Sequence, residues 1–150
     1  MKVVLSFGSN LGDSFQILES AIASLSDAVT VTHVSTFIET EPLGGPVQPN
    51  YLNAVVIAET QLEPMDLLRA VNRIEHEFGR VRNLRWGPRT LDIDIIKYGE
   101  LEMNTDELQL PHPRAHERKF VLEPWLEIDP EASLPGLGSA SRLLANISQE

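Results

Sequence analysis

The chain has 150 residues, 42% of them hydrophobic and 23% charged, which is typical of one globular domain. It contains no cysteine, and this excludes disulfides, thiolate metal sites and a cysteine nucleophile. The formal net charge of -10 argues against general binding of nucleic acid, whose backbone demands a basic surface. An acidic chain that binds a polyphosphate must concentrate its positive charge locally. We expect a single domain over residues 1–150.

The first ten residues, MKVVLSFGSN, hold too few apolar side chains after Lys2 for a signal peptide, and far too few to span a bilayer. We therefore expect a cytoplasmic protein without membrane attachment.

The first half of the chain predicts three strands and one helix. A β-prone run at 3–7 ends at Gly8, and Asp13 or Ser14 can then cap a helix. Apolar residues recur at helical spacing after this cap, at Ile17, Leu18, Ala21, Ile22 and Leu25. The β-branched segment 29–38 predicts a strand, the proline- and glycine-rich segment 39–50 a loop, and 51–60 a third strand.

The second half begins with a helix that starts near Pro64 and stops at Gly79. Residues 80–90 look irregular, 91–98 predict a fourth strand, and the remainder mixes short elements with prolines. The order strand-helix-strand occurs twice. It predicts an α/β fold of the ferredoxin-like split βαβ type, a sandwich with helices packed on an antiparallel or mixed sheet.

The strongest local signal is the run Leu91-Asp92-Ile93-Asp94-Ile95-Ile96. Because alternate strand residues share a face, Asp92 and Asp94 should point together, away from an apolar core, with Cα atoms about 6.5–7 Å apart. Two metal ions about 3.5–4 Å apart fit between such carboxylates, and oxygen ligands suit magnesium. An amphipathic strand whose outer face happens to be acidic would give the same pattern.

Four arginines lie just before this strand, at Arg80, Arg82, Arg85 and Arg89, in a chain with only 12 Lys and Arg. Guanidinium groups match phosphate oxygens in bidentate geometry. Their position beside paired acids favours a metal-polyphosphate site over a solvated loop that offsets nearby acids.

Three weaker clusters complete the set. The segment 8–13 follows a strand and opens a helix but lacks the Gly-Lys-Ser/Thr ending of a P-loop, so a tight turn explains it better. His112 lies between two prolines, which favours a positioned contact, although a loop histidine is usually a surface residue. Tyr51 offers a flat face and Asn53 a donor–acceptor pair for a heterocycle, although Tyr51 taken alone is better explained as a core residue at the start of a strand.

Together these segments resemble the 6-hydroxymethyl-7,8-dihydropterin pyrophosphokinase family of folate biosynthesis. The resemblance runs over nearly the whole chain, and its most specific part is the run from Arg85 to Ile96, RWGPRTLDIDII. Other matching segments are GSNLGD at 8–13, TEP at 40–42, QP at 48–49 with YLN at 51–53, RVR at 80–82, and PHPR at 111–114 with Arg118 and FVL at 120–122. The departures from the family pattern are Ile38, Glu107 and Trp125.

The resemblance implies a role for each matching residue. Asp92 and Asp94 would bind two magnesium ions, and Arg80 and Arg89 would contact the phosphates. Other ATP contacts would come from Asn72, Glu75, Arg82, Arg85, Trp86, Ile95, His112 and Arg118. Tyr51 and Phe120 would sandwich the pterin, and its edge would be bound by Thr40, Leu43 and Asn53.

The implied reaction is attack by the pterin hydroxymethyl oxygen on the β-phosphorus of ATP, with release of AMP, by a monomer that binds no nucleic acid. Two other readings compete with it: a non-catalytic nucleotide- or RNA-binding module, and a metal-dependent phosphohydrolase. AMP formation that depends on a pterin would separate the transferase from both.

Overall fold

The structure is a computed structural model that describes residues 1–10, 13–41, 50–79 and 91–148. Its elements follow along the chain as β1 (Lys2–Ser9), α1 (Ser14–Leu25), β2 (Thr30–Val34), β3 (Ile38–Thr40), β4 (Tyr51–Glu59), α2 (Pro64–Gly79), β5 (Asp92–Tyr98), β6 (Met103–Asn104), β7 (Gln109–Leu110), a 3₁₀ turn η1 (Ala115–Glu117), α3 (Lys119–Ile128), β8 (Ser133–Leu134), β9 (Gly138–Ser139) and α4 (Ala140–Ser148).

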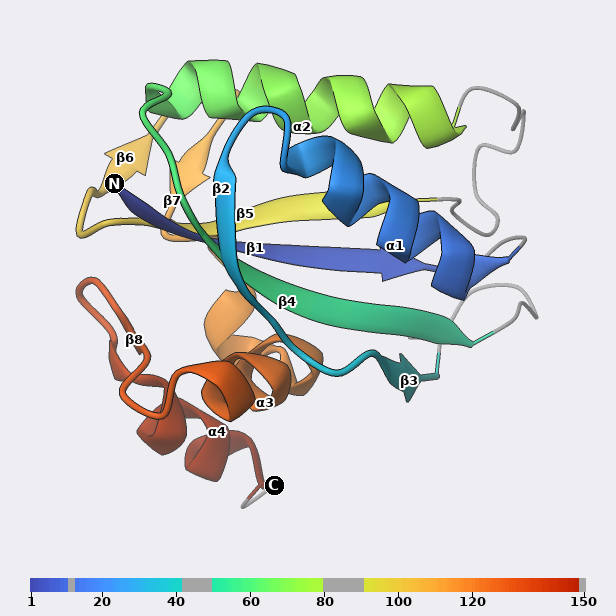
Figure 1. Ribbon diagram of the computed structural model, residues 1–150. Coiled ribbons are helices and arrows are strands. Elements are labelled where there is room, and N and C mark those ends of the chain that lie inside the picture. Colours follow the sequence, from blue (N-terminus) through green and yellow to red (C-terminus); the bar gives the residue numbers. More distant parts are fainter. Residues whose placement is uncertain (11–12, 42–49, 80–90, 149–150) are drawn as a thin grey trace.

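One sheet organises the molecule (Figure 1). Its strand order is β2-β4-β1-β5, with β3 beside β4, and each of these pairs is antiparallel. Strands β1 and β4 lie in the centre and are apolar along most of their length, because both of their faces are covered. The described chain therefore has the expected mixture of helices and strands, with helices packed on an antiparallel sheet.

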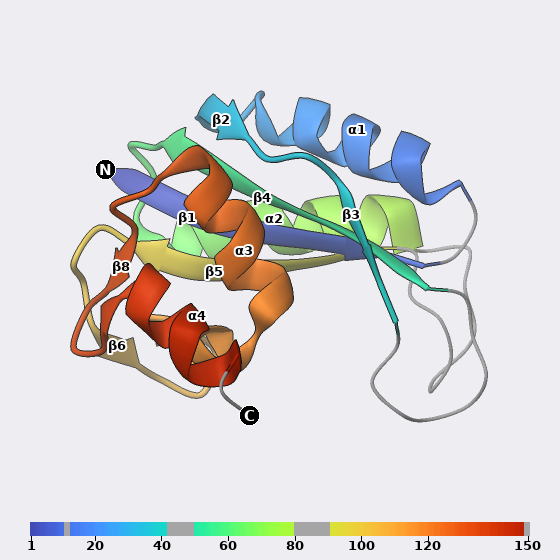
Figure 2. The same cartoon turned by 90° about the horizontal axis from the view of Figure 1, so that it is seen from below.

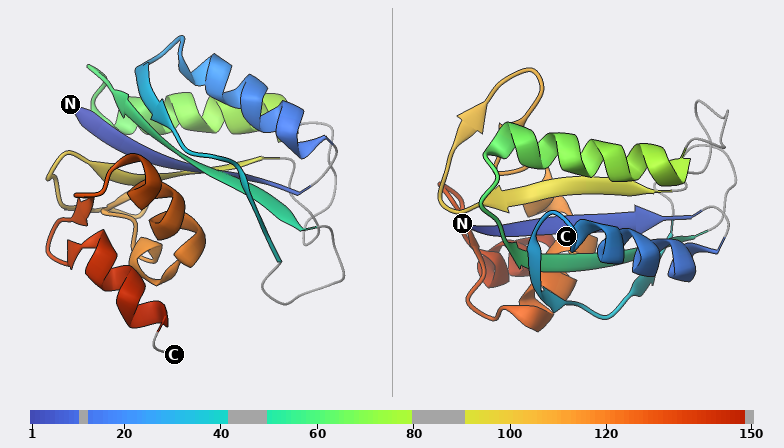
Figure 3. Two further views of the ribbon diagram at one scale, coloured as in Figure 1. Left: turned by 60° about the horizontal axis from the view of Figure 1, so that its bottom comes forward. Right: turned by 45° about the horizontal axis from the view of Figure 1, so that its top comes forward.

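Helices cover both faces of this sheet. Helices α1 and α2 lie on one face and α3 and α4 on the other, as the left view of Figure 3 shows, and Figure 2 looks onto the α3–α4 side. Alternation along β1 supplies both cores: Val3, Leu5 and Phe7 pack under α1 and α2, whereas Val4 packs under α3 and α4. Among the described residues, no helix is long and apolar enough to cross a membrane.

The first two helices form where the sequence predicts them. The Asp13 carboxylate accepts the Gln16 backbone N–H at 3.2 Å and caps α1, which begins at Ser14. Helix α2 has Pro64 as its first residue, and its apolar stripe buries Leu67 and Val71 completely.

The prediction of one strand over 29–38 is wrong. The structure divides this segment into β2 and β3, and the loop expected from Glu39 begins only after Thr40. Ser35 makes the break: its hydroxyl accepts the Val55 N–H at 2.9 Å and donates to the Thr36 carbonyl at 2.9 Å. The Ser35 hydroxyl thus takes the place of a backbone carbonyl as the partner of the Val55 N–H. Strand propensities do not predict a side-chain hydrogen bond of this kind.

The C-terminal segment contains two helices that the sequence analysis did not predict. Helix α3 carries Pro124 in its interior, and both helices are short. They form because their apolar faces are buried in the second core, through Val121, Leu122 and Trp125 of α3 and Ala140 of α4. This layer places η1 and the start of α3 beside the acidic end of β5.

Candidate active site

Asp92 and Asp94 lie together on the α3 face of β5, as the alternation predicts. Ile93 and Ile95 are 5% exposed and belong to the core under α1 and α2, whereas both aspartates are half-buried and line a pocket. The pairing register brings Asp92 opposite Gly8 and Asp94 opposite Ser6 of β1. Strand geometry therefore aims two carboxylates into one space.

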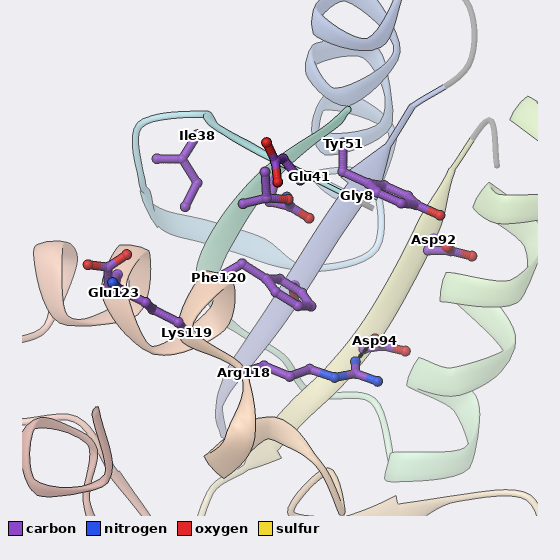
Figure 4. Close-up of a pocket in the computed structure, with 13 residues that line it drawn as sticks. Gly8, Ile38, Glu41, Tyr51, Asp92, Asp94, Arg118, Lys119, Phe120 and Glu123 are labelled. Carbon is purple, nitrogen blue, oxygen red and sulfur yellow. Dashed lines mark hydrogen bonds and ion pairs between the residues drawn. The ribbon is translucent and has the colours of Figure 1, made fainter. Parts of the chain in front are cut away.

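This pocket has a volume of about 540 Å³ and lies between the sheet, β3 and the start of α3 (Figure 4). Cavities of this size ordinarily hold small-molecule ligands. Its lining combines carboxylates, cations, aromatic rings and small polar groups: Ser6, Gly8, Ile38, Thr40, Glu41, Tyr51, Asn53, Asp92, Asp94, Arg118, Lys119, Phe120 and Glu123.

One end of the pocket has the groups that bind a flat heterocycle. Phe120 projects into the cavity from α3, and Tyr51 lies at the start of β4 on the other side (Figure 4). The Asn53 amide donates to the Thr40 hydroxyl at 2.6 Å, so both side chains are fixed before any ligand arrives. Two ring faces and a preset polar edge suit a planar, hydrogen-bonding ligand.

Gly8 lies in close contact with the Asn53 side chain. The two residues are paired across β1 and β4, and a Cβ atom added at Gly8 would lie 3.0 Å from the Asn53 amide oxygen. No side chain fits there unless Asn53 moves. The segment 8–13 thus opens a helix, as expected, and its first glycine also gives Asn53 its place on the pocket floor.

The other end of the pocket gathers charge around Asp94. The Arg118 guanidinium lies 3.4 Å from one Asp94 oxygen, and His112 Nε2 lies 3.8 Å from the same oxygen. Arg118 also lies against Phe120, with 5.6 Å between its guanidinium carbon and the ring centroid. A carboxylate, a guanidinium and an imidazole thus converge within reach of one ligand.

His112 is held in a defined tautomer. Its backbone N–H donates to the Ile96 carbonyl at 2.9 Å, and its ring Nδ1 accepts the Arg114 N–H at 3.1 Å. The neutral ring therefore carries its proton on Nε2, the atom that faces Asp94. Burial lowers the pKa of His112; Asp94 opposes this shift, and Arg118 adds to it. The ring is thus favoured in its neutral form, as an Nε2–H donor.

The remaining predicted residues are arranged around β5. Glu75 on α2 accepts the Ile93 N–H at 2.8 Å and so fixes the peptide between the two aspartates. Asn72 is exposed on α2. The Ile95 side chain is in the core on the opposite face from the pocket, so only its backbone on this edge strand is open to a ligand.

Comparison with known protein families agrees with this arrangement. The sequence model of the family described as 7,8-dihydro-6-hydroxymethylpterin-pyrophosphokinase (HPPK) matches residues 4–130, a span that includes every pocket residue. The chain belongs to the HPPK family.

Curated HPPK relatives are 38–46% identical to this chain over the aligned positions. The 2-amino-4-hydroxy-6-hydroxymethyldihydropteridine pyrophosphokinase of Bacillus subtilis (strain 168) is 46% identical over 126 residues, which are 83% of this chain and 75% of that protein. The protein of the same name from Mycobacterium tuberculosis (strain ATCC 25618 / H37Rv) is 43% identical over 159 aligned positions, covering 97% of this chain and 84% of that one.

Solved structures of HPPK-containing proteins have the same fold. A crystal structure of an HPPK-DHPS in complex with substrates superposes with a TM-score of 0.81 at 12% identity, over 99% of this chain and 43% of that one. Wild-type HPPK-DHPS of Plasmodium falciparum gives a TM-score of 0.77 at 14% identity, over 97% and 44%. This chain spans less than half the length of those proteins.

Six of the predicted HPPK site residues lie outside the described residues. They are Leu43, Arg80, Arg82, Arg85, Trp86 and Arg89, and their roles stay predictions. In the described part of the chain, no group of three or more His, Cys, Asp or Glu side chains could hold a metal ion.

The sequence analysis missed several residues that line the HPPK pocket. Ser6 is hidden in an apolar strand, and only its pairing with Asp94 reveals it. Glu41 lies in the matching TEP segment, where the resemblance gave it no role, and Lys119 and Glu123 look like ordinary surface charges in the sequence. Helical spacing from Phe120 to Glu123 is the one signal that could have found the last of these.

Proposed function

We propose that this pocket transfers the pyrophosphoryl group of ATP to 6-hydroxymethyl-7,8-dihydropterin, which gives AMP and the pterin diphosphate. Transfer of this kind is the activity of the HPPK family, and it belongs to folate biosynthesis. The observation that carries the assignment to this pocket is the joining of two features in one cavity: the paired carboxylates Asp92 and Asp94, and the aromatic and amide groups of Tyr51, Asn53 and Phe120.

The pterin would occupy the aromatic end. Tyr51 and Phe120 would cover the two faces of the ring, and Asn53 with Thr40 and Leu43 would bind its polar edge. The Asn53–Thr40 bond of 2.6 Å supports this, because polar groups that are already fixed lose little conformational entropy when the ligand binds.

The carboxylate pair fits magnesium. Asp92 and Asp94 offer only oxygen, and two carboxylates suit an ion that completes its shell with water and phosphate. When bound, two such ions would neutralise charge on the polyphosphate and lower the pKa of the attacking hydroxyl. Glu75, through its bond to the Ile93 N–H, would hold the two aspartates in register.

The nucleotide would lie over the charged end and the β5 edge. Arg118 and the Nε2–H of His112 would donate to phosphate oxygens, together with Arg80 and Arg89, while Arg82, Arg85 and Trp86 would close over the site. Asn72 and Glu75 would line the nucleotide side, where Ile95 contributes through its backbone.

Phosphoryl transfer needs positioning and charge neutralisation more than covalent chemistry from the protein. The pterin hydroxymethyl oxygen would attack the β-phosphorus in line, and AMP would leave from the opposite side. The protein's part is to hold the ring between Tyr51 and Phe120 and to place the phosphates against Arg118 and the arginines of 80–89.

We propose that the chain has a ferredoxin-like split βαβ fold. The order β1-α1-β2, β4-α2-β5 and the strand order β2-β4-β1-β5 support it, with β3 as an addition beside β4. We also propose that residues 1–150 form one domain, because both cores share one sheet. We further propose that this domain is active as a cytoplasmic monomer.

One incubation tests the function. The chain is mixed with ATP, magnesium and hydroxymethyldihydropterin, and AMP is measured with and without the pterin. Pterin-dependent AMP supports the proposal. Nucleotide hydrolysis that needs no pterin would indicate a phosphohydrolase, and binding without turnover would indicate a non-catalytic module.

A further inference from the structure

A carboxylate on α3 ties that helix to the segment between β2 and β3. Both Glu127 oxygens accept the Thr36 backbone N–H at 3.2 Å, and the Thr36 hydroxyl donates to one of them at 2.9 Å. The two residues are 91 positions apart in sequence. Three bonds to one ionised group, made by one residue, form a directional contact rather than a chance surface approach.

The other side of this segment is fixed to the sheet. Ser35 is 4% exposed; its N–H donates to the Val55 carbonyl at 2.9 Å, and its hydroxyl accepts the Val55 N–H at the same distance. Residues 35 and 36 therefore join β4 on one side to α3 on the other. The chain then enters β3 directly, two residues after Thr36.

The two elements joined in this way are opposite walls of the pocket. Strand β3 supplies Ile38 and Thr40, and α3 supplies Phe120 and Glu123 (Figure 4). Glu127 follows Glu123 by four residues and Phe120 by seven, so it lies on the same helix face as the pocket wall. The contact between Thr36 and Glu127 thus connects these two walls from outside the pocket lining.

We propose that Glu127 is a positioning residue for the pterin, because it sets the separation between β3 and the start of α3. This inference rests on the proposed function. A ring held between aromatic faces needs that separation constant, since small displacements of a binding wall weaken the contacts it makes. Glu127 and Thr36 are exposed, so water competes for the same bonds. The contact therefore acts on pocket geometry more than on folding.

Two substitutions test the contact: Glu127→Ala removes all three bonds, and Thr36→Val removes only the hydroxyl bond. Pterin affinity is measured by calorimetry with a saturating non-hydrolysable ATP analogue and magnesium, and the analogue is also titrated alone. We expect Glu127→Ala to weaken pterin binding roughly tenfold and Thr36→Val about threefold. The analogue affinity should stay within about twofold of wild type, and Thr36→Val combined with Glu127→Ala should be no worse than Glu127→Ala alone.

Lys2→Ala is the matched control. Lys2 also ties the end of α3 to the sheet, through Asp129 at 3.4 Å, but neither residue lines the pocket. It should lower the thermal midpoint about as much as Glu127→Ala while leaving pterin affinity unchanged. Glu127→Gln keeps one acceptor oxygen and should recover part of the pterin affinity.

Three results would overturn the positioning role: unchanged pterin affinity in Glu127→Ala, equal losses for both ligands, or an equal pterin loss in Lys2→Ala. The proposed function fails separately, if the wild-type chain itself neither binds the pterin nor forms AMP.

Discussion

Asp92 and Asp94 share one face of β5 but have different neighbours. Asp94 has Arg118 and His112 within 4 Å, whereas Asp92 faces Gly8 across the strand pair. Arg118 can orient Asp94 in the absence of a ligand. The pocket therefore holds at least one of its two carboxylates in a defined orientation before a ligand binds.

Removing either carboxylate should abolish turnover without unfolding the chain. Asp92→Ala or Asp94→Ala would remove a group that supports several kcal/mol of charge stabilisation, so we expect AMP formation to fall roughly 10³-fold or more. Circular dichroism should be unchanged, because both side chains face the pocket. Asp106→Ala serves as the control, because it removes an exposed acid that does not line the pocket. Near-normal turnover in either pocket variant would contradict the metal assignment.

Phe120 should contribute to the binding of the pterin and not to the binding of ATP. Phe120→Ala deletes the ring that projects into the pocket, and an aromatic contact contributes about 0.5–1.5 kcal/mol beyond its buried area. We expect pterin binding to weaken about tenfold or more while the ATP analogue binds almost normally. Separate titrations of each ligand measure this. Parallel losses would mean that the start of α3 has unfolded.

At the scale of elements, the register of β5 depends on α2. Glu75 accepts the Ile93 N–H of β5, which lies at the edge of the sheet formed by the described strands. A helix side chain thus replaces the missing neighbouring strand beside the two aspartates.

Glu75→Ala should therefore reduce both stability and turnover. A buried N–H left without its acceptor costs about 1–3 kcal/mol, and the same loss frees the peptide between the aspartates. Urea unfolding measures the change in stability, and AMP formation measures the change in turnover. Glu77→Ala, two residues further along α2 and exposed, should change neither. A stability loss with normal turnover would limit Glu75 to a role in folding.

The elements also show what sequence patterns can predict. The alternation in β5 and the stripes of α1 and α2 come from side chains that choose between a core and solvent, so the sequence alone predicted them. The break at Ser35 depends on a hydroxyl bonding Val55, 20 residues away. Helix α3 persists around Pro124 because its apolar face is buried, a tertiary effect that outweighs local propensity. Glu41 and Glu123 reach the pocket only through these unpredicted elements.

For the whole molecule, one sheet supports two cores. Leu5 and Phe7 of β1 pack under α1 and α2, while Val4 between them packs under α3 and α4. Neither layer of helices can detach without exposing the shared strands. We therefore expect all described elements to unfold together.

Trp125→Ala tests that expectation. Trp125 is 1% exposed in the second core, and its truncation should cost about 3–5 kcal/mol. Far-ultraviolet circular dichroism and calorimetry should still report one shared transition, at a lower temperature. Two separated transitions would show that α3 and α4 form an independent unit, against the single-domain proposal.

The close approach of Gly8 to Asn53 limits how this pocket can evolve. A substitution at position 8 adds a Cβ atom 3.0 Å from the Asn53 oxygen, which must then shift by a few tenths of an ångström, and a substitution at position 53 moves or removes the amide that lines the pocket. A change at either position therefore acts on the other, and we expect their effects on pterin binding to be coupled. An inhibitor that bonds to the Asn53 amide would contact a position where resistance mutations are costly to the enzyme.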